Sequence, residues 1–264
     1  MKLIEPPRPR VCQSLSANAQ QRFKRIEGWP LFFCDWDRAL FMHFEVDPDI
    51  LQPQIPFELD LYRGKAIVSL VAFTMRNLRL SIGGRFSAFL TAPVATHPLL
   101  NVRTYIRHQD QAGIYFMTEW IPNRLSILIG PRTYGLPYRY GKLNYQHNHE
   151  NGNLLGAVTP GNNTGRFAYE ATIETNTTFK PCATGTLSHF LLERYTAFTK
   201  WHKQARLFRI WHQPWLQTQL NVTITDDSAL KASGTWYQAS RLVGANYSPG
   251  VKKVWMARPR RVRT

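Results

Sequence analysis

Residues 101–120 read NVRTYIRHQDQAGIYFMTEW, and this stretch predicts a β-hairpin. Two runs rich in β-branched and aromatic residues, 101–107 and 113–120, are separated by five polar or small residues, as antiparallel strands joined by a short turn would be. Alternate side chains of a strand share a face. Arg103 and Tyr105 therefore lie together, on the face opposite to Val102. We expect this hairpin to form part of the central sheet.

Further segments on both sides of the hairpin predict a strand-rich domain. The other predicted strands are 36–46, 66–73, 125–129, 166–175 and 216–225. The predicted helices are 13–26 and 186–198, with at most one helical turn within 47–56. Ser188 or Thr186 would cap the second helix. Many strands and few helices favour an α+β domain built on antiparallel sheet.

Half of the net charge of +16 over 264 residues lies at the two ends of the chain, and the other half is spread over the body. Residues 1–27 hold six Lys/Arg and two Glu, and the four arginines after Met256 add as much again. This distribution attracts anionic partners without specifying a nucleic-acid site. We divide the chain into an N-terminal arm with a short helix (1–34), a single domain (35–256) and a basic tail (257–264).

The number of cysteines and the length of the apolar runs indicate in which cellular compartment the protein lies. The chain has three cysteines, an odd number, and they are far apart in sequence, which is typical of reduced thiols in a cytoplasm. No apolar run reaches the roughly 18 residues that span a bilayer. We therefore expect a cytoplasmic protein with no membrane partner.

Eight short motifs, in order along the chain, resemble the YqjF-like family, also known as domain of unknown function 2071. They are Trp36…Leu40-Phe41-Met42-His43…Val46, Gly64-Lys65-Ala66…Phe73-Thr74-Met75, Asn101-Val102-Arg103-Thr104-Tyr105, Gly113-Ile114-Tyr115-Phe116, Leu136-Pro137-Tyr138, Leu192-Glu193-Arg194-Tyr195, His212-Gln213-Pro214-Trp215 and Tyr247-Ser248-Pro249-Gly250-Val251. More remotely, the family resembles the acetoacetate decarboxylase superfamily. The resemblance implies an α+β fold, a mostly antiparallel β barrel or sheet around a small cavity, with few helices.

The resemblance also bears on residues 130–142, which read GPRTYGLPYRYGK and which we expect to form a loop after the 125–129 strand. The decarboxylases carry a Gly-Arg-Glu…Gly-Tyr-Pro-Lys-Lys pattern whose first lysine forms a Schiff base. Here Tyr138 and Arg139 stand in the places of the two lysines. Tyrosine cannot form an imine, and Lys142 follows four residues late. If the protein is an enzyme, we therefore expect chemistry other than Schiff-base decarboxylation.

The candidate ligand-binding residues combine cations and phenols that suit an organic acid. They are Arg103, Tyr105, Arg132, Tyr138 and Arg139. The weaker catalytic candidates are Tyr138, Lys142 and Glu119. YqjF-like sequences usually carry a glutamate where this chain has Leu99, so Glu119 is a candidate substitute. The alternatives are an exposed strand glutamate, an arginine paired inside the barrel and a packed turn tyrosine.

Other polar clusters have simpler interpretations. Residues 200–211 interleave basic and aromatic residues, which suits either nucleic acid or the solvated face of a helix. The cluster 147–150 (His-Asn-His-Glu) lies in a polar stretch, and we expect no metal and no cofactor. His43 and His212 are interpreted as core hydrogen-bonding histidines, and Arg194 as part of a structural ion pair.

The leading hypothesis is a protein that binds a small organic acid, or a similar small molecule, in a barrel cavity bordered by Arg103, Tyr105, Arg132 and Tyr138. The alternative is a basic interaction protein that uses 200–211 and the two ends of the chain to bind nucleic acid or an acidic partner. A homo-oligomer is compatible with either hypothesis.

Overall fold

The hairpin predicted from residues 101–120 is present in the computed structural model, which describes residues 11–263. Strands β4 (His97–His108) and β5 (Gln111–Ile121) pair antiparallel, with Asn101 directly opposite Glu119. A register shift between Val102 and Arg103 marks a β-bulge, which strengthens the local twist of the pair. The hairpin therefore curves, as a strand pair in a closed barrel must.

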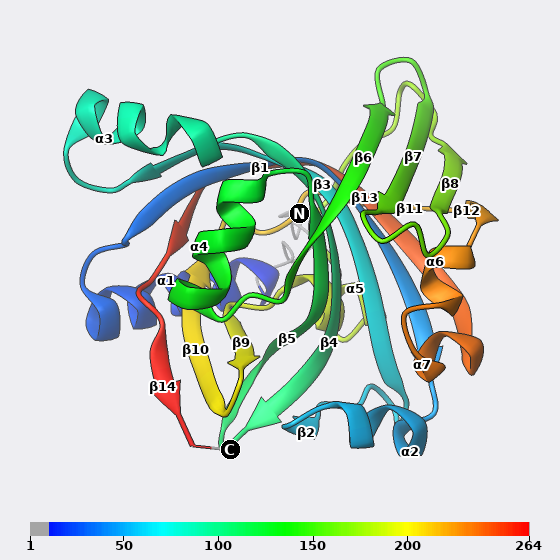
Figure 1. Cartoon of the computed structure of the whole chain (residues 1–264), viewed down its shortest axis with the longest axis horizontal. Helices are drawn as coiled ribbons and strands as arrows, with labels where there is room; N and C mark the ends of the chain where they lie inside the picture. Colours follow the sequence, from blue (N-terminus) through cyan, green and yellow to red (C-terminus); the bar gives the residue numbers. More distant parts are fainter. Residues whose placement is uncertain (1–10, 264) are drawn as a thin grey trace, which may run out of the picture.

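The remaining elements fall on both sides of this hairpin in the sequence (Figure 1). The other strands are β1 (Phe32–Val46), β2 (Glu58–Leu59), β3 (Ala66–Leu80), β6 (Tyr138–Asn148), β7 (Asn153–Pro160), β8 (Phe167–Thr172), β9 (Thr196–Trp201), β10 (Gln204–Trp211), β11 (Thr218–Leu220), β12 (Val222–Asp226), β13 (Ser240–Met256) and β14 (Arg260–Val262). The helices are α1 (Val11–Glu27), α2 (Pro48–Leu51), η1 (Gln52–Gln54), α3 (Gly84–Thr91), η2 (Ala92–Val94), α4 (Arg124–Tyr134), α5 (Leu187–Leu192), α6 (Ser228–Lys231) and α7 (Thr235–Gln238).

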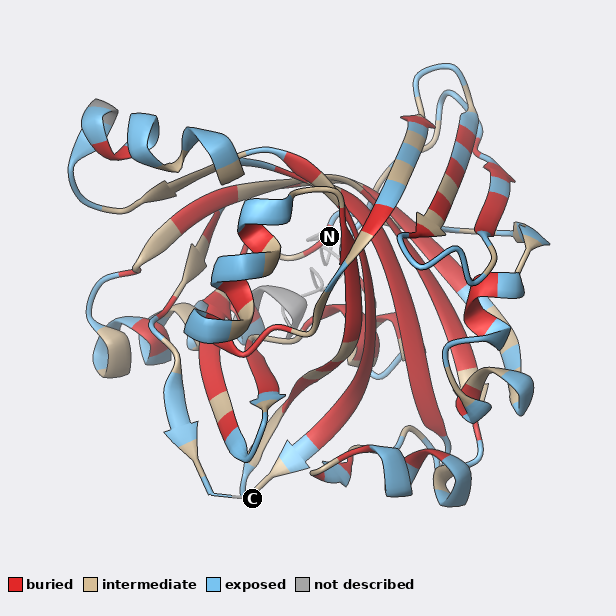
Figure 2. Ribbon diagram, viewed as in Figure 1, coloured by how far each residue is buried: buried red, intermediate tan, exposed pale blue. Residues whose placement is uncertain are grey.

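Strand pairing closes the sheet into a barrel. The ring runs β5–β9–β10–β13–β1–β3–β4 and returns to β5, because β4 pairs with both β3 and β5. Most pairs are antiparallel, whereas β5 pairs parallel with β6 and with β9. Figure 2 shows that the ring strands β3, β4 and β5 are buried over much of their length. The α+β class and the mostly antiparallel barrel with few helices are confirmed.

Two apolar clusters fill the fold. One cluster lines the barrel interior and receives side chains from every strand of the ring, among them Phe41, Val71, Tyr105 and Phe208. The other lies on the outer face of the ring, where the arm formed by β6, β7, β8 and β12 packs against it. Because the first half of β3, residues 66–73, is covered on both faces, it reads as a nearly continuous apolar run.

The prediction of a strand over 125–129 is wrong, because these residues belong to helix α4. Asn123 caps the helix, accepting a hydrogen bond from the Ser126 amide at 2.9 Å, and Gly135 ends it with φ +72°. The stretch 130–142 is accordingly the end of a helix, a short link and the start of β6. It is not one loop.

The helix suggested for 200–211 is also wrong. The segment contains the end of β9 and all of β10, joined by a tight turn at His202 and Lys203. His202 adopts φ +53°, a left-handed conformation that a non-glycine residue adopts in such turns. The predicted helix over 186–198 is likewise shorter: α5 covers only Leu187–Leu192, capped by Thr186, and β9 starts at Thr196.

The two ends of the described chain pack on the barrel. Phe23 of α1 is buried against Trp255, with ring centroids 5.6 Å apart. Within the predicted basic tail, β14 pairs with β10 and Arg260 forms an ion pair with Glu27 at 2.8 Å. Residues 1–10, part of the predicted N-terminal arm, lie outside the described residues. The proposed domain boundaries stay a prediction.

Candidate ligand site in the barrel interior

The inward face of β4 carries a row of polar side chains through the barrel. Strand alternation places Asn101, Arg103 and Tyr105 on this face, and all three are buried. The alternate residues Val102 and Thr104 face the outer side. Arg103 and Tyr105 therefore share a strand face, as predicted from the hairpin. The polar row lies inside the apolar cluster of the barrel.

Arg103 is a buried cation without a carboxylate partner. Only 9% of the residue is exposed, and no acidic group of the described chain lies within 4.0 Å of its guanidinium as an ion pair. Its Nη2 donates a long 3.4 Å hydrogen bond to the Leu191 carbonyl, and its Nε has no partner. The rings of Phe41 and Tyr105 lie 5.6 and 5.9 Å from the guanidinium.

Glu119 faces the same interior from β5, but its carboxyl group is hydrogen-bonded to the side-chain amide of Asn101. Its Oε1 accepts a hydrogen bond from Asn101 Nδ2 at 3.0 Å, whereas Glu119 Oε2 and Asn101 Oδ1 have no partner. Burial raises the pKa of Glu119 to about 8, against the lowering effects of Asn101 and Arg103. Glu119 is thus mainly a neutral acid at pH 7, and it does not neutralise Arg103.

Tyr138 opens β6 opposite Glu119, because β5 and β6 pair in parallel at this point. Its ring lies over Gly130 of α4, where an added Cβ would be 2.4 Å from Cε2 of the tyrosine. Burial and the neighbouring Glu119 raise the pKa of Tyr138 well above its usual value. The phenol therefore stays neutral and can exchange hydrogen bonds, but it cannot serve as an anionic nucleophile.

A hydrogen-bonded chain continues from Tyr105 across the barrel. Tyr105 Oη and Ser69 Oγ lie 2.7 Å apart, and Ser69 Oγ lies 2.7 Å from His43 Nδ1. The other ring nitrogen of His43 lies 3.0 Å from Asn246 Oδ1. Burial lowers the pKa of His43 to about 3, so its imidazole is neutral. His43 is thus the core hydrogen-bonding histidine predicted from the sequence.

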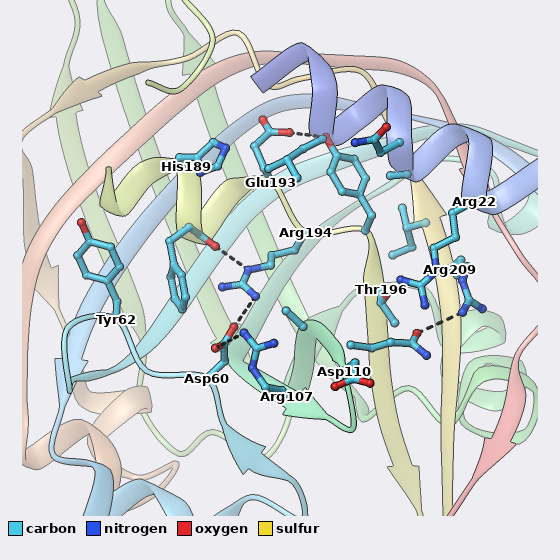
Figure 3. Close-up of a pocket in the computed structure, with 18 of the residues that line it drawn as sticks. Arg22, Asp60, Tyr62, Arg107, Asp110, His189, Glu193, Arg194, Thr196 and Arg209 are labelled. Atoms are coloured by element: carbon cyan, nitrogen blue, oxygen red, sulfur yellow. Dashed lines mark hydrogen bonds and ion pairs between the residues drawn. The ribbon is translucent and has the colours of Figure 1, made fainter. Parts of the chain in front are cut away.

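An open pocket of about 520 Å³ lies at one end of the barrel, between α1 and α5 (Figure 3). Asp60 sits between two arginines there, 2.7 Å from Arg194 Nη1 and 3.1 Å from Arg107 Nη2. Arg194 is therefore in a structural ion pair, as predicted. The ring of Phe190 on α5 packs against Tyr105 in a tilted arrangement, with centroids 5.6 Å apart, so α5 separates this pocket from the polar row.

A second pocket, of about 270 Å³, lies at the opposite end of β4. Its walls are almost entirely apolar, and Tyr138 and His97 line it. Burial lowers the pKa of His97 to about 4, which keeps this imidazole neutral at pH 7. The interior polar row thus lies between a charged pocket at one barrel end and an apolar pocket at the other.

The structure does not bring all the predicted ligand residues together. Arg132 is exposed on α4 and donates to the Leu128 carbonyl at 2.6 Å. Arg139 and Lys142 are exposed on β6, Arg139 because strand alternation turns it away from Tyr138. A cavity bordered by both Arg103 and Arg132 is thus excluded by geometry, because one faces the interior and the other the solvent. Every lysine among residues 11–263 is exposed.

Side chains of the two remaining clusters, 147–150 and 200–211, form contacts within the fold. His147 lies 2.8 Å from Tyr169 Oη, and His149 lies 2.8 Å from Tyr247 Oη. In the described part of the chain, no group of three or more His, Cys, Asp or Glu side chains is arranged to hold a metal ion. Arg209, from the basic segment 200–211, forms an ion pair with Glu27 at 2.9 Å.

Two residues of the interior were missed as site residues. Asn101 could have been found, because it shares the strand face of Arg103 in the alternating pattern. Ser69 gave no signal, since it lies within the apolar run 66–73 and its role depends on pairing with His43, 26 residues away.

The sequence matches DUF2071, described as an uncharacterized conserved protein, over residues 34–252. The chain belongs to this family. It is also 31% identical over 202 residues to the uncharacterized protein YqjF of Bacillus subtilis (strain 168), covering 75% of this chain and 80% of YqjF. The family resemblance drawn from the eight motifs is confirmed.

Solved structures share the fold at low identity. Acetoacetate decarboxylase from Legionella pneumophila superposes with a TM-score of 0.62 at 11% identity, covering 89% of this chain and 88% of the decarboxylase. An acetoacetate decarboxylase-like enzyme from Sphingomonas wittichii RW1 gives 0.62 at 14% identity, covering 89% and 94%. The enduracididine biosynthesis enzyme MppR complexed with pyruvate gives 0.58 at 14%, covering 88% and 90%. The DUF2071 chain therefore has the acetoacetate decarboxylase-like fold.

Within residues 11–263, no helix is both long and apolar enough to cross a membrane.

Proposed function

We propose that this DUF2071 protein binds a small organic acid in the barrel interior, with the carboxylate of the ligand held by Arg103. One observation carries the proposal: Arg103 is buried without an anionic partner. Removing a charge from water without compensation costs several kcal/mol, so buried charges are ordinarily paired. A carboxylate offers the fork geometry that a guanidinium binds best.

Asn101 and Glu119 supply the second part of the site. Each keeps one buried oxygen without a hydrogen-bond partner. The protonated form of Glu119 can donate a hydrogen bond to a carbonyl, hydroxyl or carboxylate oxygen of the ligand. A carboxylate and one further oxygen therefore match the donors present, and the apolar interior suits a short hydrocarbon body. This describes a small keto or hydroxy acid.

The fold comparison agrees with this ligand class. The structure of MppR was solved with pyruvate, a small keto acid. Imine chemistry is outside the proposal, because every described lysine is exposed and because the family resemblance implies Tyr138 where the decarboxylases have their Schiff-base lysine. A reaction, if one occurs, would depend on proton transfer by Glu119 or on the positioning of the ligand by Arg103. The alternative of a basic nucleic-acid protein loses support, because Arg206 and Arg209 of the 200–211 segment bond within the fold.

The experiment is a thermal-shift panel of pyruvate, lactate and benzoate, each compared with its neutral amide. The carboxylates are expected to raise Tm and the amides are not. The Arg103→Gln variant should lose the shift, whereas the exposed Arg132→Gln variant should retain it. Equal shifts for the two variants, or no shift with any carboxylate at millimolar concentration, would count against the proposal.

A further inference from the structure

Two adjoining hollows lie on the outer side of the barrel wall, away from the interior polar row. The smaller hollow, of about 150 Å³, and the larger, of about 450 Å³, share the lining residues Trp120, Arg139 and Ser233. Trp120 of β5 belongs to the outer apolar cluster and pairs in register with Arg139 of β6, whereas Ser233 follows α6. Figure 1 shows α6 and α7 outside the ring of strands, on the same side as the arm. We call the two hollows together the outer groove.

Arg139 is the cation of the outer groove, and no acidic side chain neutralises it. It is exposed and lines both hollows. In the part of the chain that the structure describes, Arg139 forms no ion pair, and no Asp or Glu lines either hollow. Arg124 lies over the ring of Tyr140, 5.1 Å from its centroid, and is not part of either wall. The outer groove therefore offers a single positive charge.

An unpaired arginine is common on a protein surface, and Thr118 supplies the feature that makes this arginine part of a site. Thr118 lies two residues before Trp120 on the outward face of β5 and lines the smaller hollow. Only 8% of the residue is exposed, and its Oγ1 has no hydrogen-bond partner. Buried hydroxyl groups are nearly always hydrogen-bonded, because an unsatisfied one costs free energy. An anionic group that enters the smaller hollow can accept this hydrogen bond beside the Arg139 guanidinium.

The walls of the outer groove are rich in aromatic side chains. Tyr115 and Trp236 join Trp120 around the smaller hollow, and Tyr140 lines the larger one together with Trp120. Aromatic walls with a few polar groups that converge on one point are typical of small-molecule sites. Aromatic rings also pack favourably against one another. The outer groove therefore suits an anion with an aromatic body.

We infer that the outer groove is a second ligand site, which binds an aromatic carboxylic acid with its carboxylate between Arg139 and Thr118 and its ring in the larger hollow. A guanidinium and a hydroxyl donate to the two oxygens of one carboxylate. A phosphate monoester, with about two negative charges at neutral pH, would meet only one cation. The inference does not depend on the proposed function, because Arg103 lies inside the barrel and Arg139 outside it.

The experiment is calorimetric titration of the full chain with phenylacetate, its neutral amide phenylacetamide, and phenyl phosphate. The titrations use the Arg103→Gln variant, because loss of the interior guanidinium weakens any competing binding inside the barrel. Phenylacetate is expected to bind saturably at millimolar concentration, and the amide at least tenfold more weakly. No saturable binding of phenylacetate, or tighter binding of phenyl phosphate, would overturn the inference.

Three further substitutions locate the bound acid. Arg139→Gln should weaken phenylacetate binding at least tenfold, whereas Lys142→Gln, which removes another exposed cation from β6, should leave it unchanged. Thr118→Val keeps the shape of the side chain and removes only the unpartnered hydroxyl. It should weaken binding at least threefold without lowering the free energy of unfolding. Unchanged affinity in Arg139→Gln or Thr118→Val, or a destabilised Thr118→Val, would contradict the assignment.

Nuclear magnetic resonance of the wild type provides a test that needs no substitution. Trp236 of α7 lines the smaller hollow and belongs to the outer apolar cluster, so its indole N–H resonance should shift with phenylacetate and not with phenylacetamide. Shifts confined to residues of the barrel interior would place the acid beside Arg103 and would rule out the outer groove.

Discussion

Arg103 and Glu119 face one interior from neighbouring strands, yet the carboxyl group of Glu119 bonds to Asn101 and no ion pair joins it to the arginine. Burial keeps Glu119 largely protonated at neutral pH, so Glu119 supplies no negative charge opposite Arg103 in the apolar barrel. A structural ion pair would have satisfied both groups. Their separation is the arrangement expected of a site that receives its anion from outside.

The pKa of Glu119 predicts a specific pH dependence of stability. Between about pH 4.5 and about pH 8, the unfolded chain ionises this group while the folded chain keeps it protonated. Folding therefore binds a proton, and the free energy of unfolding falls as pH rises through this range. Urea unfolding at pH 5 and pH 8.5 should show a difference on the order of a few kcal/mol from this group. Glu119→Gln should flatten this dependence, and an unchanged slope in that variant would argue against a buried neutral acid.

Gly130 is required by the ring of Tyr138. An added Cβ would lie 2.4 Å from that ring, so Gly130→Ala should force the ring or helix α4 to shift and cost about 1–3 kcal/mol. Gly244→Ala is the matched control, because nothing lies within 4 Å of its added Cβ. Chemical denaturation of the two variants checks this, and equal stability would show that Tyr138 is not held over α4.

The ion pair in the charged pocket and those at the exposed surface differ in their importance to stability. Asp60→Asn leaves the almost fully buried Arg194 without its carboxylate, and a loss of about 3 kcal/mol is expected. Glu45→Gln removes longer contacts, 4.0 and 3.6 Å, to exposed Lys65 and Arg241, and should cost under about 1 kcal/mol. Denaturant midpoints measure both changes. A comparable cost for the two variants would refute the structural role given to Asp60.

Imine formation can be tested by trapping. Pyruvate with borohydride should leave the mass of the protein unchanged, because all lysines between residues 11 and 263 are exposed and none faces the interior. Mass spectrometry before and after reduction gives the answer. A trapped adduct at Lys142 would mean that β6 can turn this side chain inward.

Local patterns in the sequence predicted the parts of the fold that depend on strand alternation. The hairpin at 101–120 and the shared face of Arg103 and Tyr105 follow from a period of two residues, which holds wherever a strand forms. Helix α4 was missed because a five-residue apolar run is too short to separate strand from helix. The β9–β10 hairpin was missed because its turn, at His202, has neither Gly nor Asn.

Contacts between residues that are distant in sequence could not be predicted. Asp60 meets Arg194 across 134 residues, and no local pattern links them. Arg132 and Arg139 were placed with Tyr138 because 130–142 was interpreted as a loop. Once α4 and β6 form, their helical and strand geometry turns both arginines outward and only Tyr138 inward. Strand alternation predicts that Arg103 shares a face with Tyr105. That Arg103 has no carboxylate partner is seen only in the folded barrel.

The Arg103→Gln variant tests the central claim most directly, measured by calorimetric titration with the carboxylate that gives the largest thermal shift, together with urea unfolding of the ligand-free protein. Affinity should fall at least tenfold while the ligand-free variant is as stable as the wild type or more so, because an unpaired buried charge has been removed. Unchanged affinity, or a variant destabilised by about 3 kcal/mol as when a buried ion pair is broken, would contradict the account.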